Sequence, residues 1–95
     1  MPALPADHPK VNFIRVEAKT GLTLVRLAHT ERWSGDRSGA DRAIGLARKA
    51  LETARHFLPK LALTPAVKQE LQQEIDTLAA EIGRYDNTSE DSVSR

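Results

Sequence analysis

The sequence predicts an all-α protein: a three-helix antiparallel bundle of up-down-up topology with disordered N- and C-terminal tails. Three observations lead to this fold class. Apolar residues recur at three- and four-residue steps in three segments, turn and capping residues separate these segments, and the connections are short enough to join antiparallel neighbours. The predicted parts, in chain order, are a flexible proline-rich arm at 1–10, a bundle at 11–85 with helices at about 11–33, 38–58 and 65–84, and a disordered polar tail at 86–95.

Both ends of the chain are predicted to lie outside the bundle. Met1 to Pro9 holds three of the five prolines, which lack backbone donors and disfavour helix at the residues before them. The last ten residues hold one apolar side chain, Val93, so burial cannot offset the entropy lost on ordering them.

The segment from Val11 to Trp33 is predicted to be the first helix, with a β-hairpin as the competing interpretation. Residues at helical steps form its apolar stripe: Val11, Ile14, Ala18, Gly21, Leu22, Val25 and Ala28, widened by Phe13, Leu24 and Leu27. A hairpin would place strands at 11–18 and 22–29. The alternation that a strand requires fails at Phe13-Ile14 and Leu24-Val25, so helix is favoured.

The second helix is predicted to begin after a glycine-containing turn. Ser38, with Asp41 three residues on, resembles a capping box. An alanine-rich stripe follows: Ala40, Ile44, Ala47, Leu51, Ala54 and Leu58. Such a stripe lets a neighbouring helix approach closely, and Pro59 is predicted to force Leu58 out of helical geometry and end the run.

The third helix is predicted to begin with Thr64 as the capping residue and Pro65 at the first helical position. One narrow apolar seam runs along it: Val67, Leu71, Ile75, Leu78 and Ile82. Gly83 is the predicted stop signal.

Charge is distributed unevenly along the chain, whose net charge is +1. Residues 1–62 carry eleven Lys and Arg against six Asp and Glu, whereas residues 63–95 carry three against seven. The absence of cysteine excludes a disulfide framework and a thiolate zinc site, and points to a reducing compartment, for which the cytoplasm is the default expectation. We expect neither a signal peptide nor a membrane span.

No group of residues predicts catalysis, a metal site or a cofactor. Glu52 and His56 are four apart on the second helix, but two ligands do not make a metal site, so a surface pair is expected. Glu70 and Glu74 share one helix face without a recognisable apolar pocket that would raise a carboxylate pKa. His29 borders the first apolar stripe and is expected to be structural. We therefore expect a protein that is not an enzyme.

Two helical families resemble this sequence. One set of positions is similar to a tetratricopeptide unit: Leu24, Leu27, Ala28, Gly35, Ala40, Ile44 and Ala47. The sequence departs from that unit at Arg37 and Glu31, where aromatic residues are expected, and at Glu52, where a proline is expected. With the third helix included, residues 11–85 resemble the microtubule-interacting and trafficking (MIT) domain, a three-helix bundle.

The MIT resemblance implies a non-enzymatic adaptor whose helix–helix groove accepts a short, often helical, peptide. The groove is expected between the first and third or the second and third helices, around four residues of the seam: Val67, Leu71, Ile75 and Leu78. Trp33 is a further candidate for binding a partner, because buried tryptophan often contributes much of an interface's energy. The competing interpretation of Trp33 is that it closes one end of the core.

The leading functional prediction is a helical protein–protein interaction or assembly module that presents a groove to a partner helix or to a second copy of itself. A nucleic-acid-associated protein is the alternative, and its candidate residues are Arg15, Lys19, Arg26, Arg42, Arg48, Lys49 and Arg55. A third possibility is an accessory subunit of an enzyme. No membrane partner is expected.

Overall fold

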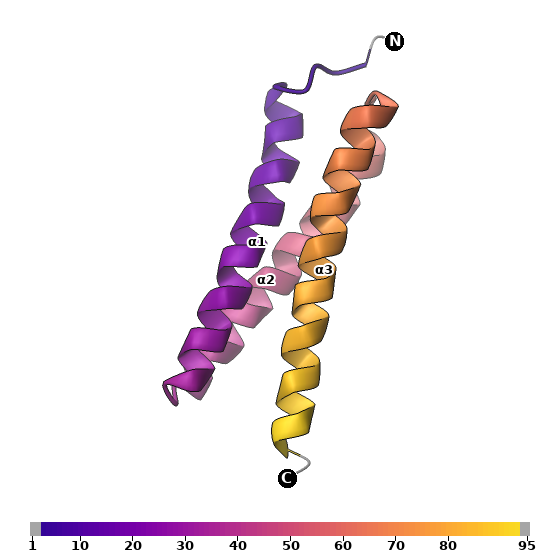
Figure 1. Ribbon diagram of the computed structural model, residues 1–95. Helices are drawn as coiled ribbons and strands as arrows, with labels where there is room; N and C mark the ends of the chain where they lie inside the picture. Colours follow the sequence, from indigo (N-terminus) through magenta and orange to yellow (C-terminus); the bar gives the residue numbers. More distant parts are fainter. Residues whose placement is uncertain (1–2, 94–95) are drawn as a thin grey trace.

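A computed structural model describes the backbone of residues 3–93 and the side chains of residues 3–88. It contains three α-helices, α1 (Pro9–Trp33), α2 (Arg37–Phe57) and α3 (Pro65–Val93), and one 3₁₀ turn, η1 (Leu58–Lys60) (Figure 1). The predicted all-α, three-helix fold is confirmed, and residues 11–29 are helical rather than a β-hairpin.

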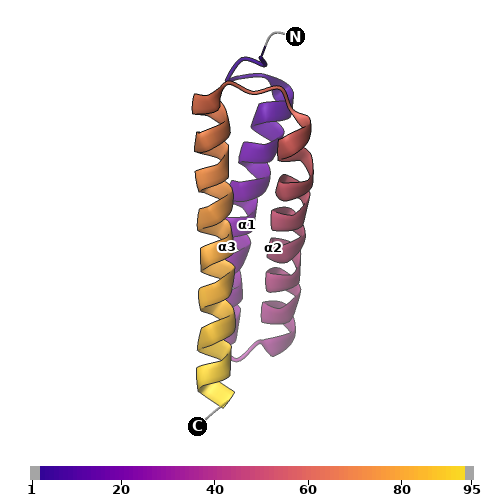
Figure 2. The same cartoon turned by 90° about the vertical axis from the view of Figure 1, so that its right-hand side faces the viewer.

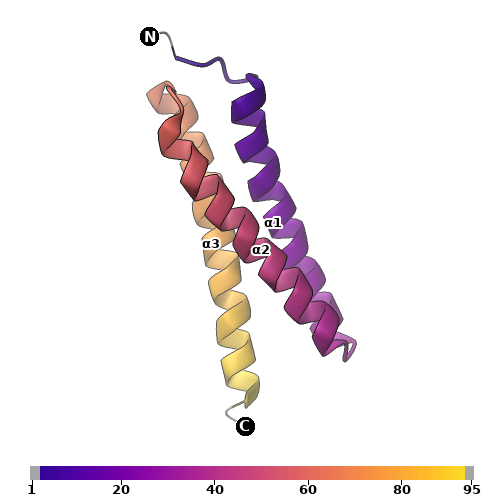
Figure 3. The ribbon, with the colours of Figure 1, turned by 180° about the vertical axis from the view of Figure 1, so that it is seen from behind.

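The three helices extend along a common long axis (Figure 2). Helix α2 runs antiparallel to α1 and α3 and crosses them diagonally (Figure 3). It lies beside α1 at the turn after Trp33 and beside α3 at the opposite end, where η1 connects them. This crossing spreads α1 and α2 apart at the end where α1 begins.

The crossing divides the core into two clusters. The cluster near the α1–α2 turn contains Val25, Ala28, Ala43, Ile44, Ala47, Leu78, Ile82 and Tyr85. The cluster at the other end contains Val11, Ile14, Ala54, Leu58, Leu71 and Ile75. Half-buried Leu51 packs against both clusters and so connects them along α2.

Small residues allow the helices to pack closely, as the alanine-rich stripe predicted. Five alanines of α2 are buried: Ala40, Ala43, Ala47, Ala50 and Ala54. On α1, a Cβ atom placed on Gly21 would lie 2.5 Å from Cδ2 of Leu78. Real Cβ atoms do not approach other atoms so closely, so the Leu78 side chain can take this position only because residue 21 has no side chain.

Two local predictions about α2 were wrong. Asp36, not Ser38, is its N-cap: Oδ1 of Asp36 accepts a hydrogen bond of 2.8 Å from the backbone N–H of Gly39. Gly35 adopts φ +91°, which turns the chain so that Asp36 reaches this position. Leu58 keeps helical dihedrals, because Pro59 occupies the first turn of η1, where its missing N–H is not needed. The chain becomes extended at Leu61 instead.

Asp36→Ala is expected to lower the free energy of unfolding by about 1 kcal/mol, because it removes the cap from α2. Ser38→Ala is the matched control, and we expect it to change that free energy by less than about 0.5 kcal/mol. Urea unfolding followed by circular dichroism measures both. A greater loss from Ser38→Ala than from Asp36→Ala would contradict the observed cap.

The start of α3 confirms the prediction, whereas its end does not. The hydroxyl of Thr64 accepts a hydrogen bond of 3.3 Å from the backbone N–H of Val67, and Pro65 is the first helical residue. Gly83 does not stop the helix, because it lacks the positive φ of a terminating glycine. Tyr85 is the last buried residue among those whose side chains are described. Within the predicted polar tail, residues 86–93 continue α3 beyond this core, and residues 94–95 lie outside the described chain.

The predicted N-terminal arm is extended but contacts the bundle. The backbone N–H of Leu4 donates a hydrogen bond of 2.7 Å to the carbonyl of Ala62, beside a parallel bridge to Leu63. The Leu4 side chain is half-buried against the second core cluster. The arm therefore contacts the bundle at Leu4, and residues 1–2 are outside the described chain.

Candidate interaction site

The apolar seam of α3 is used inside the bundle. Leu71, Ile75 and Leu78 are fully buried, and Val67 is half-buried against the second core cluster. These four residues were predicted to line a partner groove, but in the folded chain α1 and α2 cover them. An apolar row at helical spacing requires a covering surface, and here the hairpin of the same chain supplies it.

Trp33 does not close the core, contrary to one interpretation of the sequence. Its side chain is 93% exposed at the end of α1. Tyr85 closes this end instead: it is buried, its ring lies 3.7 Å from the guanidinium carbon of Arg32, and its carbonyl accepts a hydrogen bond of 3.2 Å from Nη2 of Arg32. The ring of His29 packs edge-on against the Tyr85 ring at a centroid distance of 5.1 Å. Trp33 is therefore free to contact another molecule.

The α1–α2 hairpin has a second apolar face, on the side not covered by α3. Every exposed large hydrophobic residue in the described chain belongs to this hairpin. Trp33 lies at its turn; we call the others the outer face: Phe13, Val16, Leu27, Leu46 and Phe57. Leu24 lies between the α1 members at helical spacing and is half-buried. Helix α3 packs against the other side of the hairpin, so no described residue covers the outer face.

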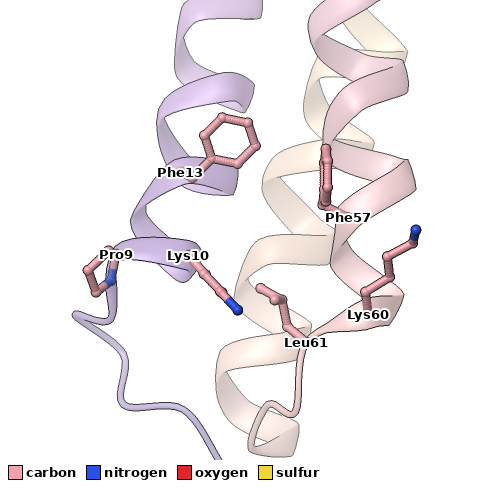
Figure 4. A pocket seen from close by; sticks show the side chains of 6 residues that line it. All are labelled: Pro9, Lys10, Phe13, Phe57, Lys60 and Leu61. Carbon is pink, nitrogen blue, oxygen red and sulfur yellow. The ribbon is translucent and has the colours of Figure 1, made fainter.

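A cleft opens at the end of the outer face where α1 and α2 diverge (Figure 4). Its volume is about 460 Å³, and its lining residues are Pro9, Lys10, Phe13, Phe57, Lys60 and Leu61. Phe13 and Phe57 face each other from the two helices, with ring centroids 5.7 Å apart and ring planes 87° apart. We call this the Phe13–Phe57 cleft; it provides a largely apolar recess beside the two contacting rings.

Glu70 and Glu74 are held in an ion-pair cluster rather than in a catalytic pocket. Nη2 of Arg15 lies 2.8 Å from Oε1 of Glu70, and Nε of Arg15 lies 3.8 Å from Oε2 of Glu74. Arg15 also donates a hydrogen bond of 3.2 Å to the carbonyl of Ala6. The cluster joins the N-terminal arm, α1 and α3, and such partly exposed pairs stabilise a fold by about 0–1 kcal/mol.

Glu52 and His56 are both exposed on α2 beside a shallow depression. Within the described part of the chain, no three potential metal ligands among His, Asp and Glu come together. The ring of His56 packs edge-on against Phe57 at a centroid distance of 4.9 Å.

The cations proposed for nucleic-acid binding lie on different sides of the hairpin. Arg15 is held by Glu70, and Arg48 forms an ion pair with Asp86. The remaining five are exposed and form no ion pair with residues 3–88: Lys19, Arg26, Arg42, Lys49 and Arg55. Arg42 and Lys49 border Leu46 on α2, whereas Lys19 and Arg26 lie on α1, where Lys19 is three residues after Val16.

Comparison of this chain with protein-family models, curated proteins and solved structures finds no match. Among the described helices, none has both the length and the apolar character needed to cross a membrane.

Proposed function

We propose that this protein is a non-enzymatic helical interaction module that uses the outer face of its α1–α2 hairpin to bind a helix. One observation carries the proposal: the exposed large hydrophobic residues of the two helices gather on the side of the hairpin that α3 leaves uncovered. An amphipathic helix fits such a surface, because its residues at three- and four-residue spacing enter the groove between two helices.

The surface of α3 provides the contrast. Among residues whose side chains are described, α3 has no exposed large hydrophobic residue, and its outward positions are mostly Gln, Asp, Thr and Ala. The apolar exposure is therefore not a general property of this small protein. It belongs to one side, as is typical of an interaction surface.

The proposal agrees in kind with the adaptor role that the MIT resemblance implies, but it uses a different groove. That resemblance placed the peptide against α3, whose seam is buried. The outer face lies on the opposite side of the hairpin and is available without rearrangement of the core. Trp33, exposed at the end of α1, offers an additional contact at the turn.

Leu27→Glu combined with Leu46→Glu is expected to weaken binding by at least about tenfold. Leu27 and Leu46 are 44% and 48% exposed, so covering the remaining surface would contribute about 1 kcal/mol each. Two buried carboxylates would add a desolvation penalty. Sedimentation velocity measures self-association, and fluorescence anisotropy measures binding of labelled amphipathic helical peptides.

Gln73→Glu combined with Ala80→Glu is the matched control, because it adds the same charge to the exposed side of α3. We expect this variant to bind as the wild type does, and both variants to retain the wild-type circular dichroism spectrum. The proposal is wrong if the wild type remains a monomer and binds no helical peptide, or if both variants weaken binding equally.

The nucleic-acid alternative rests on the exposed cations of α1 and α2. It predicts that binding to labelled duplex or single-stranded DNA weakens steeply as salt is added, through counterion release. Absence of binding at low salt would exclude it. The separation of Lys19 and Arg26 from Arg42 and Lys49 favours the helix-binding proposal, because a backbone-tracking surface needs its cations in one stripe.

A further inference from the structure

The rim of the Phe13–Phe57 cleft carries positive charge and no negative charge. Lys10 on α1 and Lys60 at the end of η1 are its only charged lining residues. Nζ of Lys60 lies 5.9 Å from the centroid of the Phe57 ring. Neither lysine forms an ion pair with any carboxylate of residues 3–88, so both charges are available to a ligand.

Further cations continue along the α2 edge of the outer face. Arg42 and Lys49 lie four residues before and three residues after Leu46, so they flank this apolar side chain on one side of the helix. Both are exposed and form no ion pair within the described side chains. The carboxylates of α1 on this side, Glu17 and Glu31, are half-buried and do not line the cleft.

We propose that the occupant of the outer face is an acidic amphipathic helix of another protein, which inserts one large apolar side chain into the cleft beside the Phe13 and Phe57 rings and places carboxylates beside Lys10 and Lys60. This inference rests on the proposed function and adds the chemistry of the partner. The apolar recess beside the rings receives the inserted side chain, and the unpaired lysines at its rim select negative charge next to it.

A second copy of the chain fits this surface less well. The carboxylates that a second outer face would offer, Glu17 and Glu31, are half-buried, so they complement the exposed lysines of the cleft less well than the exposed carboxylates of a separate helix do. The acidic helix of the chain, α3, does not supply the ligand either. Its described outer surface lacks large hydrophobic residues, and its carboxylates Glu70, Glu74 and Asp86 are engaged by Arg15 and Arg48.

The experiment uses the full chain and two synthetic peptides of equal length. Both peptides carry leucine at helical spacing along one side and have alanine at identical other positions. They differ only in that the first has glutamate at the positions where the second has glutamine. Fluorescence anisotropy measures both affinities at low and at moderate salt. We expect the glutamate peptide to bind about tenfold more tightly at low salt, and we expect this preference to shrink as salt screens the charges.

Three variants test which residues of the protein cause the preference for the glutamate peptide. Lys10→Glu combined with Lys60→Glu is expected to abolish the preference for the glutamate peptide. Lys68→Glu combined with Arg84→Glu changes the net charge by the same amount on the exposed surface of α3, away from the outer face, and is expected to preserve the preference. Phe57→Ala is expected to weaken the binding of both peptides, because it removes one wall of the cleft. Circular dichroism verifies that each variant is folded.

The outcomes separate the two proposals. If the glutamine peptide binds as tightly as the glutamate peptide, or if both charge-reversal variants reduce the preference equally, the acidic-helix inference is wrong while the proposed function stands. If the chain associates with itself through the outer face and ignores both peptides, the inference is again wrong and the occupant is a second copy. If the chain neither self-associates nor binds either peptide, both proposals fail.

Discussion

Replacing Ile75 with alanine is expected to lower the free energy of unfolding by about 2–5 kcal/mol, the usual range for removing a large aliphatic side chain from a core. Ile75 is fully buried in the cluster that includes Ile14 and Leu71. Small domains have a total stability of about 5–15 kcal/mol, so this single change would remove a large fraction of it. Urea unfolding followed by circular dichroism gives the value.

Gln73→Ala is the control for Ile75→Ala, because Gln73 is exposed on the same helix and the substitution should change the unfolding free energy by less than about 0.5 kcal/mol. The pair of variants also tests which surface of α3 is buried. Equal stability of Ile75→Ala and the wild type would mean that the seam is not part of the core, and the partner groove predicted along it would regain its basis.

The helices were predictable because their periodicity is a property of the sequence alone. Capping at Thr64 was predictable for the same reason: it directly precedes a proline that suits only the first turn. The start of α2 was ambiguous, because Ser34, Asp36 and Ser38 are all capping residues within one turn. The positive φ of Gly35 turns the chain so that Asp36, and neither serine, lies next to the free N–H groups of the first turn of α2.

The interaction site was not predicted, because an apolar row does not reveal what covers it. The seam of α3 and the outer positions of α1 both show helical spacing, and either could have formed the core. One signal was present: Phe13, Leu24 and Leu27 widen the α1 stripe beyond the roughly 100° that one neighbouring surface covers. A stripe of that width offers more apolar surface than one neighbouring helix covers. Even α2 and α3 together cover only part of it.

The role of Trp33 shows a second limit of sequence reasoning. A lone tryptophan beside a turn is a reasonable candidate for closing a core, but Tyr85 occupies that position. Tyr85 is far from the turn in sequence and reaches it because α3 runs back along the hairpin. The residues next to Trp33 in the sequence could not indicate this contact.

Gly21→Ala is expected to destabilise the protein by about 1–3 kcal/mol, the usual cost of overpacking. In an exposed helix the same substitution would stabilise by about 1 kcal/mol through helix propensity. Here the added Cβ would lie 2.5 and 2.9 Å from the two terminal methyl groups of Leu78, which is fully buried and has no free space to move into. Urea unfolding measures the change.

Leu78→Ala is expected to destabilise by about 2–5 kcal/mol on its own, and to reverse the sign of the Gly21 effect. Once the Leu78 methyl groups are absent, the Gly21 methyl group fills part of the space and the gain in helix propensity remains. The double variant should therefore be more stable than Leu78→Ala alone, with a coupling of about 0.5–3 kcal/mol between the sites. Purely additive effects would contradict the close approach of α3 to α1 at Gly21, and with it the arrangement that leaves the other side of the hairpin uncovered.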